Sequence, residues 1–335
     1  MTWFRTLTGF DEQSPDQVRA SMTLSDTTLT SLINGNSWSC GTLSMPTLRE
    51  LRLSSAEASV RGAISVAEVV ADVQALHLDT ANAGALFQVA SQFNLLEMTH
   101  PDVTPEEGVA IYDYDRTQGP ACAIAAGAGT IYRNYFVQLR GQVGQSHSNQ
   151  LDCLEKIATA LGNEDHSLWS MTNGYALPRK GALSKINEHL ASLTNAEIDV
   201  LRSSLQIGIQ SDTQVTLDRC THTVSQAYCS AMPVAYSGEL SQDWEPFARL
   251  ILEAAYEATI CAGIINAKNT GNRTVFLTLL GGGVFGNDQQ WIIDAIDRAL
   301  ALHANSGMAV RIVSFGRSKP AVAALVRKVH DRING

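Results

Sequence analysis

Apolar residues recur along the chain in blocks whose spacing predicts alternating strands and helices. Apolar runs within 83–97, at 274–280 and at 309–316 have the length of strands buried on both faces. A segment at 244–267 instead repeats its apolar residues every three or four positions, as a helix does. The same reasoning predicts strands at 205–210, 213–217 and in 224–236, and helices at 64–76, from 120, at 289–304 and at 319–330. Strands alternating with helices in this order predict an α/β fold with helices on both faces of a mixed sheet.

The pattern also suggests how the chain is divided. Residues 1–78 are rich in Ser, Thr and turn signals, so we expect an N-terminal extension that packs on the core. Residues 79–335 carry the alternating strands and helices and are expected to form the main domain. Within that domain, residues from about 140 to 203 are more polar and helical in pattern, which predicts a helical insertion.

Composition excludes several classes of function. Of the 335 residues only 17% are charged and the net charge is −9, which argues against a nucleic-acid partner because such proteins need a basic face. No apolar stretch reaches the roughly 18 residues of a membrane span, and the N-terminus has no apolar run typical of a signal peptide. We therefore expect a soluble, cytoplasmic protein without a membrane partner, although delivery to another cell stays open.

The cysteines indicate a reduced compartment. Six are scattered through the chain, none forms a CxxC pair, and no histidines cluster beside them. This spacing predicts neither a zinc site nor a disulfide framework. We expect no metal and no cofactor.

A glycine-rich loop after a buried strand is the sharpest chemical signal. The segment 281–287, GGGVFGN, follows the strand at 274–280 and opens a helix. Glycines let backbone N–H groups approach a ligand closely, and a helix N-terminus favours an anion. The loop lacks the Lys-Ser/Thr pair of a Walker loop and is not the dinucleotide GxGxxG. Phosphate binding is the favoured interpretation, and tight strand–helix packing is the alternative.

A second group of polar residues follows another strand. Asn94 ends the run at 83–97, and its amide can both donate to and accept from a ribose hydroxyl. Asp115 stands just before a helix of small residues and is followed by Thr117, Gln118 and Gly119. The carboxylate of Asp115 could orient water or a ribose hydroxyl, or it could simply cap the helix.

These loops resemble those of macrodomains, the family that binds ADP-ribose. Asn94 after FQVASQF is similar to the strand-end Asn of the family, and Val284-Phe285-Gly286 matches its phosphate loop. YDYDRTQGPACAIAAGAG stands where the family has a catalytic loop that opens a helix. The similarity spans about 79–316, and it implies a three-layer α/β/α macrodomain-like fold with an N-terminal extension and a helical insertion.

The resemblance also implies roles for single residues. Asn94 would bind the distal ribose, Asp115 would be catalytic, and Asp79 lies at about the spacing of the family's adenine-binding Asp. Glu97, three residues past Asn94, is a second candidate catalytic carboxylate. The implied substrate-binding residues are Asp79, Asn94, Thr117, Gln118, Gly119, Gly281, Gly282, Gly283, Val284, Phe285, Gly286 and Asn287.

The chain departs from the family at several points. Only the last residue of the usual Asn-Ala-Ala-Asn is matched, and no glycine run precedes Asp115. The Gln-Glu-Glu signature of poly(ADP-ribose) glycohydrolases is missing. The sequence is thus similar to a divergent macrodomain, and the departures concern mainly its catalytic residues.

Three functions remain open at this stage. The first is a hydrolase that releases mono-ADP-ribose from an arginine or a carboxylate of a modified protein. The second is a reader, which binds ADP-ribose or a related nucleotide without cleaving it. Candidate carboxylates near Asn94 favour the hydrolase, because a pocket for an anion gains nothing from extra negative charge. The third is a structural domain whose glycines serve packing.

Overall fold

A seven-stranded mixed sheet forms the centre of the computed structural model, which describes residues 1–58 and 60–334. From β12 through β6, β13 and β14 to β5 the neighbouring strands are parallel, whereas β11 runs antiparallel to both of its neighbours. In spatial order the strands are β4 (Thr42–Ser44), β11 (Gly208–Gln214), β12 (Thr223–Cys229), β6 (Leu86–Ala90), β13 (Thr274–Leu277), β14 (Ala309–Ser314) and β5 (Ser65–Val70).

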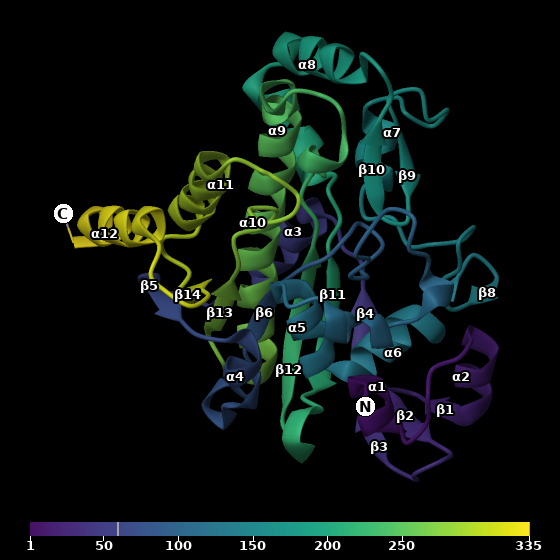
Figure 1. Ribbon diagram of the computed structural model, residues 1–335. Helices are drawn as coiled ribbons and strands as arrows, with labels where there is room; N and C mark the ends of the chain where they lie inside the picture. Colours follow the sequence, from purple (N-terminus) through teal and green to yellow (C-terminus); the bar gives the residue numbers. More distant parts are fainter. Residues whose placement is uncertain (59, 335) are drawn as a thin grey trace.

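Helices cover both faces of this sheet (Figure 1). One face carries α3 (Leu48–Glu57), α10 (Ser241–Thr270), α11 (Gln289–Leu302) and α12 (Pro320–Asn334). The other face carries α4 (Val73–Leu78), α5 (Gln118–Ala125) and α6 (Gly127–Tyr135). This arrangement confirms the predicted α/β class, a mixed sheet between two layers of helices.

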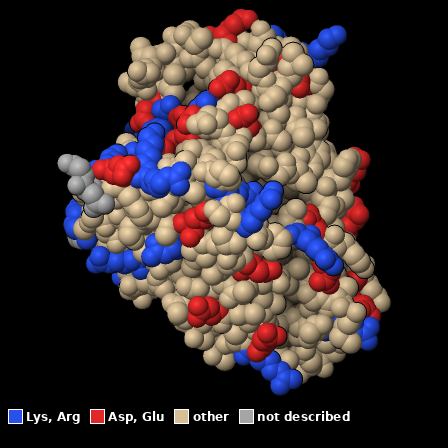
Figure 2. Space-filling model, turned by 60° about the vertical axis from the view of Figure 1, so that its left-hand side comes forward, with Lys and Arg blue, Asp and Glu red and all other residues tan. Residues whose placement is uncertain are grey.

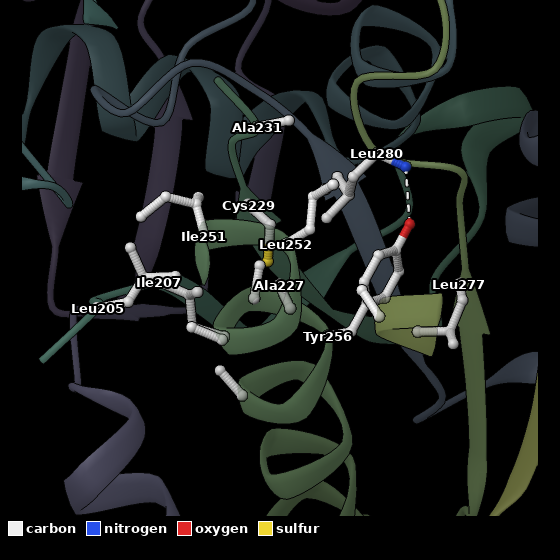
Figure 3. Close-up of a cluster of buried hydrophobic side chains, with 14 of the residues drawn as sticks. Leu205, Ile207, Ala227, Cys229, Ala231, Ile251, Leu252, Tyr256, Leu277 and Leu280 are labelled. Atoms are coloured by element: carbon white, nitrogen blue, oxygen red, sulfur yellow. Dashed lines mark hydrogen bonds between the residues drawn. The ribbon is translucent and has the colours of Figure 1, made fainter. Parts of the chain in front are cut away.

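The long helix α10 runs through the main hydrophobic core. It is long and apolar enough to cross a membrane by length and composition, but its most apolar window is 89% buried inside the protein. A helix that is apolar on all sides is expected in the centre of a large core. In Figure 3, Ile251, Leu252 and Tyr256 of α10 lie against Ala227 and Cys229 of β12. The apolar character of α10 is therefore explained by packing.

Tyr256 also connects this core to the glycine-rich loop. Its hydroxyl donates to the carbonyl of Thr278 at 2.7 Å. It also accepts from the amide of Leu280 at 2.8 Å, the bond drawn as a dashed line in Figure 3. The ring is fully buried. The first residues of the loop are thus fixed by a side chain from the centre of the molecule.

The segment 64–76, predicted as one helix, is a strand followed by a short helix. β5 takes Ser65–Val70 and α4 takes Val73–Leu78, and the turn between them is capped by Asp72, whose carboxylate accepts from the Gln74 amide at 2.7 Å. The prediction was wrong because β-branched valines, spaced here as on a helix face, favour a strand once a neighbouring strand is present.

The boundary expected at residue 78 does not separate an extension from the core. β4 and β5 both precede it, and they form the two opposite edges of the central sheet. The first part of the chain contributes Phe4 and Trp38 to a second, smaller core, which it shares with residues of 109–136. That part contains α1 (Trp3–Thr8), α2 (Pro15–Ser21) and a three-stranded sheet of β1 (Met22–Ser25), β2 (Thr28–Ser31) and β3 (Ser37–Ser39).

The region expected as a helical insertion contains strands as well as helices. Its helices are α7 (Glu155–Ala160), α8 (Ala182–Ser192) and α9 (Asn195–Ser203). Two hairpins accompany them, β7 (Gln138–Leu139) with β8 (Gln142–Val143), and β9 (Trp169–Thr172) with β10 (Tyr175–Pro178). The β9–β10 hairpin matters most, because Tyr175 of β10 lines the pocket described below.

Other differences concern boundaries. The strands expected at 205–210 and 213–217 are the single strand β11, with a register shift between Gln210 and Thr213. The helix expected from 120 is α5 followed by α6. Short 3-10 helices are η1 (Thr80–Asn82), η2 (Pro105–Glu107), η3 (Ala110–Tyr114), η4 (Leu217–Arg219) and η5 (Val234–Tyr236). Charged side chains lie interspersed on the face shown in Figure 2, between wide uncharged areas.

Candidate functional site

A pocket opens at the carboxyl ends of the parallel strands β6, β12 and β13, where open α/β sheets commonly bind ligands. Its empty volume, including open solvent at the mouth, is about 870 Å³, within the range of small-molecule sites. The walls come from the two loops singled out in the sequence, from the β9–β10 hairpin and from the segment after β12. The lining residues are Ala90, Ser91, Gln92, Glu97, Met98, Thr99, Asp115, Thr117, Gln118, Gly119, Pro120, Tyr175, Cys229, Ala231, Tyr236, Thr278, Leu279, Leu280, Gly281, Gly283, Val284 and Phe285.

The glycine-rich loop presents backbone amides to this pocket. Some of its amides close the loop on itself, because Gly286 donates to Gly283 at 3.0 Å and Asn287 to Gly281 at 2.9 Å. Others donate to no other described residue, namely those of Gly281, Gly283, Val284 and Phe285. The amide of Gly282 donates to Leu279 at 3.1 Å, so the successive unbonded N–H groups are those of Gly283, Val284 and Phe285. Such a run on a curved loop suits an anion without Lys or Arg.

Two glycines of this loop are required by its shape. Gly281 has a φ of 69°, and a Cβ there would lie 2.5 Å from the Cβ of Ala231. Gly286 has a φ of 72°. Asn287 is buried, and its amide donates to the carbonyl of Met232 at 2.8 Å, so this side chain holds the loop and does not line the pocket. By contrast, nothing lies within 4 Å of a Cβ built on Gly283.

The N-terminus of α5 forms the opposite wall. Asp115 accepts from the amide of Thr117 at 2.8 Å and lines the pocket. Gly119 lets the first turn of α5 approach β6, because a Cβ there would lie only 2.0 Å from the carbonyl oxygen of Ala90. Gln118 bonds the backbone of β6 on both sides, accepting from Ala90 at 3.0 Å and donating to Gln88 at 2.8 Å. Asp115 thus keeps one carboxylate oxygen unbonded while its neighbours fix the helix.

Asn94 does not line the pocket. It is fully buried, its amide donates to Gln150 at 2.8 Å, and its carbonyl oxygen accepts from the Leu96 amide at 3.1 Å. The turn of the β9–β10 hairpin covers it, since a Cβ on Gly174 would lie 2.6 Å from Asn94 Oδ1. The ribose-binding role implied by the resemblance is therefore wrong for this residue, whose hydrogen bonds are used inside the fold.

Glu97 is a buried carboxyl group at the floor of the pocket. Its exposed fraction is 3%, and neither carboxyl oxygen has a hydrogen-bond partner among the described residues. Burial raises the pKa of Glu97 to about 8, against the lowering effect of the nearby Arg133 guanidinium. At neutral pH this carboxyl group is therefore mostly protonated and able to donate a hydrogen bond into the pocket.

The surroundings of Glu97 are aromatic and cationic. The guanidinium of Arg133 lies 3.7 Å from the centre of the Tyr228 ring and donates to the carbonyl of Leu95 at 3.0 Å. Arg133 is fully buried, and its Nη1 has no partner among the described residues. The hydroxyl of Tyr112 accepts from the backbone amide of Glu97 at 3.1 Å. This cluster holds the backbone of Glu97 and places the Arg133 guanidinium and the Tyr112 hydroxyl near its carboxyl group, where both lower its pKa.

Asp79 lies outside the site. It caps η1, where its carboxylate accepts from the Ala81 amide at 2.9 Å, and it lines neither of the two pockets near the loops. The implied adenine contact is wrong for this position. Asp72, which follows the carboxyl end of β5, does line the second of these pockets. Asp72 follows the end of strand β5, a position that would have marked it as a candidate. We missed it because 64–76 was interpreted as a helix.

The second pocket adjoins the first. Both are lined by Asp115, Thr117, Gln118, Thr278, Leu279 and Gly283. The second has an empty volume of about 1750 Å³, open solvent included, and adds Asp72, Gln74, Phe315 and the two cations Arg116 and Lys319. The two recesses meet at Gly283, so an extended ligand can lie across the glycine-rich loop.

Three aromatic residues that the sequence did not indicate as a group form one end of the first pocket. Tyr175 of β10 lies 4.9 Å from Tyr236 and 5.3 Å from Phe285, measured between ring centres. The Tyr175 hydroxyl donates to the carbonyl of Met98, near Glu97. Of the three, only Phe285 was predicted as a substrate-binding residue, because the other two are brought in from the insertion and from η5.

Among residues 1–58 and 60–334, no three His, Cys, Asp or Glu side chains gather as a metal site would require.

No family model and no curated protein matches the chain. Solved structures similar to it include a poly(ADP-ribose) glycohydrolase from Deinococcus radiodurans in complex with ADP-ribose, with 11% identity and a TM-score of 0.45, covering 87% of this chain and 95% of that one. Another is the glycohydrolase from Thermomonospora curvata, with 13% identity and a TM-score of 0.44, covering 93% and 95%. At such identities and TM-scores, the function has to be argued from the site itself.

Proposed function

We propose that this chain binds ADP-ribose and hydrolyses the bond between mono-ADP-ribose and a protein side chain, through an arginine or a carboxylate linkage. One observation carries the proposal. A single pocket brings the unbonded amides of the loop at 281–285 together with two carboxyl groups, those of Glu97 and Asp115. The amides suit a phosphate, and the carboxyl groups suit acid–base chemistry beside it.

The shape of the site supports a ligand with groups on both sides of a diphosphate. The two recesses meet at Gly283, next to the unbonded amides. On the side of the second recess, the exposed ring of Phe315 offers a stacking surface and Asp72 offers a hydrogen-bond acceptor, as a nucleobase requires. Glu97 lines only the first recess and Asp115 lines both, so the two carboxyl groups would lie beside a second ribose bound in the first recess.

The carboxyl groups suggest a division of roles. Asp115 would accept a proton from a water molecule as its oxygen bonds to the anomeric carbon of the ribose. The bond from that carbon to the side-chain nitrogen or oxygen would break, and the leaving atom would receive the proton that Glu97 carries at neutral pH. Binding of the diphosphate would hold the anomeric carbon in place for this step.

Calorimetric titration with ADP-ribose tests the binding part. Gly283→Glu places a carboxylate among the unbonded amides without a steric clash, because nothing lies within 4 Å of its Cβ. Gly238→Glu is the matched control, since that exposed glycine also has open space and lies outside both pockets. Micromolar binding by the wild type and by Gly238→Glu, lost in Gly283→Glu, is expected. No heat from the wild type with ADP-ribose, AMP or NAD would overturn the proposal.

Release of ADP-ribose from modified proteins separates the hydrolase from the reader. Proteins carrying ADP-ribose on arginine and on glutamate are incubated with the wild type and with Asp115→Ala. Release by the wild type, reduced at least a hundredfold in Asp115→Ala, supports hydrolysis and identifies the linkage. Binding without release from either substrate would favour the reader.

A further inference from the structure

The N-terminal segment contacts the loop that leads to Asp115. Residues 105–114 include η2 and η3, and Asp115 directly follows η3. The N-terminal residues 3–12, here called the N-terminal brace, lie against this stretch. No signal in the sequence connects the two, which are about a hundred residues apart.

Glu12 supplies the main contacts of the brace. One carboxylate oxygen accepts from the amide of Val109 at 3.0 Å, and the other accepts from the amide of Ala110 at 2.6 Å. The hydroxyl of Tyr135 donates to the first oxygen as well. These two amides begin η3, so the carboxylate satisfies donors that the helix itself leaves unbonded.

Gly108 makes this approach possible. A Cβ at that position would lie 2.3 Å from Oε2 of Glu12, and its φ is 86°. The close fit shows that the carboxylate is packed against the backbone of the loop.

Trp3 adds two more contacts from the other end of the brace. Its indole N–H donates to the carbonyl of Val109 at 3.0 Å, and its backbone amide donates to the carboxylate of Asp113 at 2.7 Å. Phe4, fully buried, lies in the same small core as Val109 and Tyr112. The brace thus holds both the backbone and one buried face of η3.

Both candidate catalytic groups depend on the position of η3. Asp115 follows it directly, and its amide donates to the carbonyl of Tyr112 at 3.2 Å. The hydroxyl of Tyr112 accepts from the amide of Glu97 at 3.1 Å. A shift of η3 would therefore move Asp115 and the support of Glu97 together.

We propose that Glu12 is a positioning residue, which through η3 fixes Asp115 and Tyr112 for the reaction. Glu12 touches no ligand, since it lines neither pocket. The loop at 281–285 has no contact with the brace through hydrogen bonds. Loss of the Glu12 contacts is thus expected to lower turnover and to leave ADP-ribose affinity nearly unchanged. This role rests on the proposed function.

The test uses Glu12→Gln. Its side chain keeps one acceptor oxygen, but the NH2 group that replaces the other oxygen cannot accept from the second of the two amides, those of Val109 and Ala110. Asp11→Asn is the matched control, because it removes the neighbouring negative charge, and the Asp11 side chain is paired with Arg5 alone among the described residues. Hydrogen exchange of the peptide 105–118, ADP-ribose affinity and kcat are measured for each. We expect Glu12→Gln to exchange faster in this peptide, to lose at least tenfold in kcat and to change Kd less than threefold.

Trp3→Phe is a second variant, which removes one hydrogen bond to Val109 and keeps an aromatic ring. It is expected to change exchange and kcat in the same direction by a smaller factor, and it serves alone if Glu12→Gln does not fold. Unchanged kcat despite faster exchange, unchanged exchange, or an equal loss in Asp11→Asn would overturn the positioning role. If the wild type hydrolyses no substrate, the proposed function fails, and without a reaction to position for, the role assigned to Glu12 fails with it. Exchange at 105–118 then still shows whether Glu12 holds η3.

Discussion

Glu97 is buried, and among residues 1–58 and 60–334 no hydrogen-bond partner meets its carboxyl oxygens, which is unusual because such groups are normally satisfied. A buried carboxylate destabilises the folded state when it is charged, and burial therefore raises the pKa of Glu97 so that the group stays protonated. A group that reduces stability and faces a pocket is typical of a functional site.

The pH dependence of stability follows from this pKa. Glu97 ionises near its ordinary value of 4.5 in the unfolded chain and near 8 in the folded protein. Between these values the folded state binds more protons, so the contribution of Glu97 to stability falls as the pH rises from about 4.5 to about 8. Glu97→Gln should therefore gain stability relative to the wild type over this range. Urea unfolding at pH 5 and pH 8 measures the difference in free energy of unfolding between Glu97→Gln and the wild type. The same difference at both pH values would contradict the raised pKa of Glu97.

Gly119 gives a prediction about packing. In Gly119→Ala the new Cβ would meet the carbonyl oxygen of Ala90 at 2.0 Å, so α5 must move away from β6. We expect a loss of about 1–3 kcal/mol in the free energy of unfolding, as for other overpacked sites. Gly283→Ala is the control, because its Cβ meets no atom within 4 Å, and it should change stability by less than about 0.5 kcal/mol. Denaturant unfolding of both variants makes the comparison.

At the scale of whole elements, the long apolar segments were predicted well. The strands β6 and β13 and the helices α10 and α11 were identified because each keeps one spacing over its length. The two glycine-containing loops of the pocket were found for a related reason, since they directly follow or precede such segments. Asp115 and the glycine-rich loop, both singled out from the sequence, thus lie at the same pocket.

Elements whose identity depends on distant partners were missed. β5 is a strand because β14 pairs with it, and its valines alone are compatible with a helix. Tyr175 reaches the pocket on a hairpin that the insertion builds, and the local turn signal at Asn173-Gly174-Tyr175 does not show that the hairpin lies beside the glycine-rich loop. Asn94 carried the expected local signal, but the turn at Gly174 covers it. Long-range contacts of this kind decided each of the misses.

Four helices are joined by a network of charges. Arg52 of α3 pairs with Asp199 of α9 at 2.7 Å and with the nearly buried Glu257 of α10, and Arg298 of α11 pairs with Glu257 at 2.7 Å. Removing one partner of a buried pair leaves the other charge unpaired, which is strongly destabilising.

We expect Arg52→Met to lower the free energy of unfolding by about 3 kcal/mol, at the lower end for buried pairs because Arg298 still contacts Glu257. Arg5→Met is the comparison, since its pair with Asp11 is exposed, and it should change stability by less than about 1 kcal/mol. Thermal and urea unfolding provide both values. A loss in Arg52→Met no larger than that in Arg5→Met would show that the network contributes little.

For the whole molecule, ligand binding and folding are linked. A ligand that binds only the folded state at a hundred times its Kd adds about 2.7 kcal/mol to stability. ADP-ribose should therefore raise the melting temperature of the wild type and of Gly238→Glu, and leave that of Gly283→Glu unchanged. Thermal melts at several concentrations measure the shift. A shift of equal size in Gly283→Glu would place the ligand elsewhere on the protein.

The position of β4 and β5 at opposite edges of the sheet has a consequence for synthesis on the ribosome. Both strands are made early, yet β4 pairs with β11 at 208–214 and β5 pairs with β14 at 309–314. Neither can find its partner until much later parts of the chain have emerged. Each strand therefore stays unpaired while the residues between it and its partner are synthesised, the condition in which chains aggregate and chaperones bind. Native sheet edges form last from the segments that were made first.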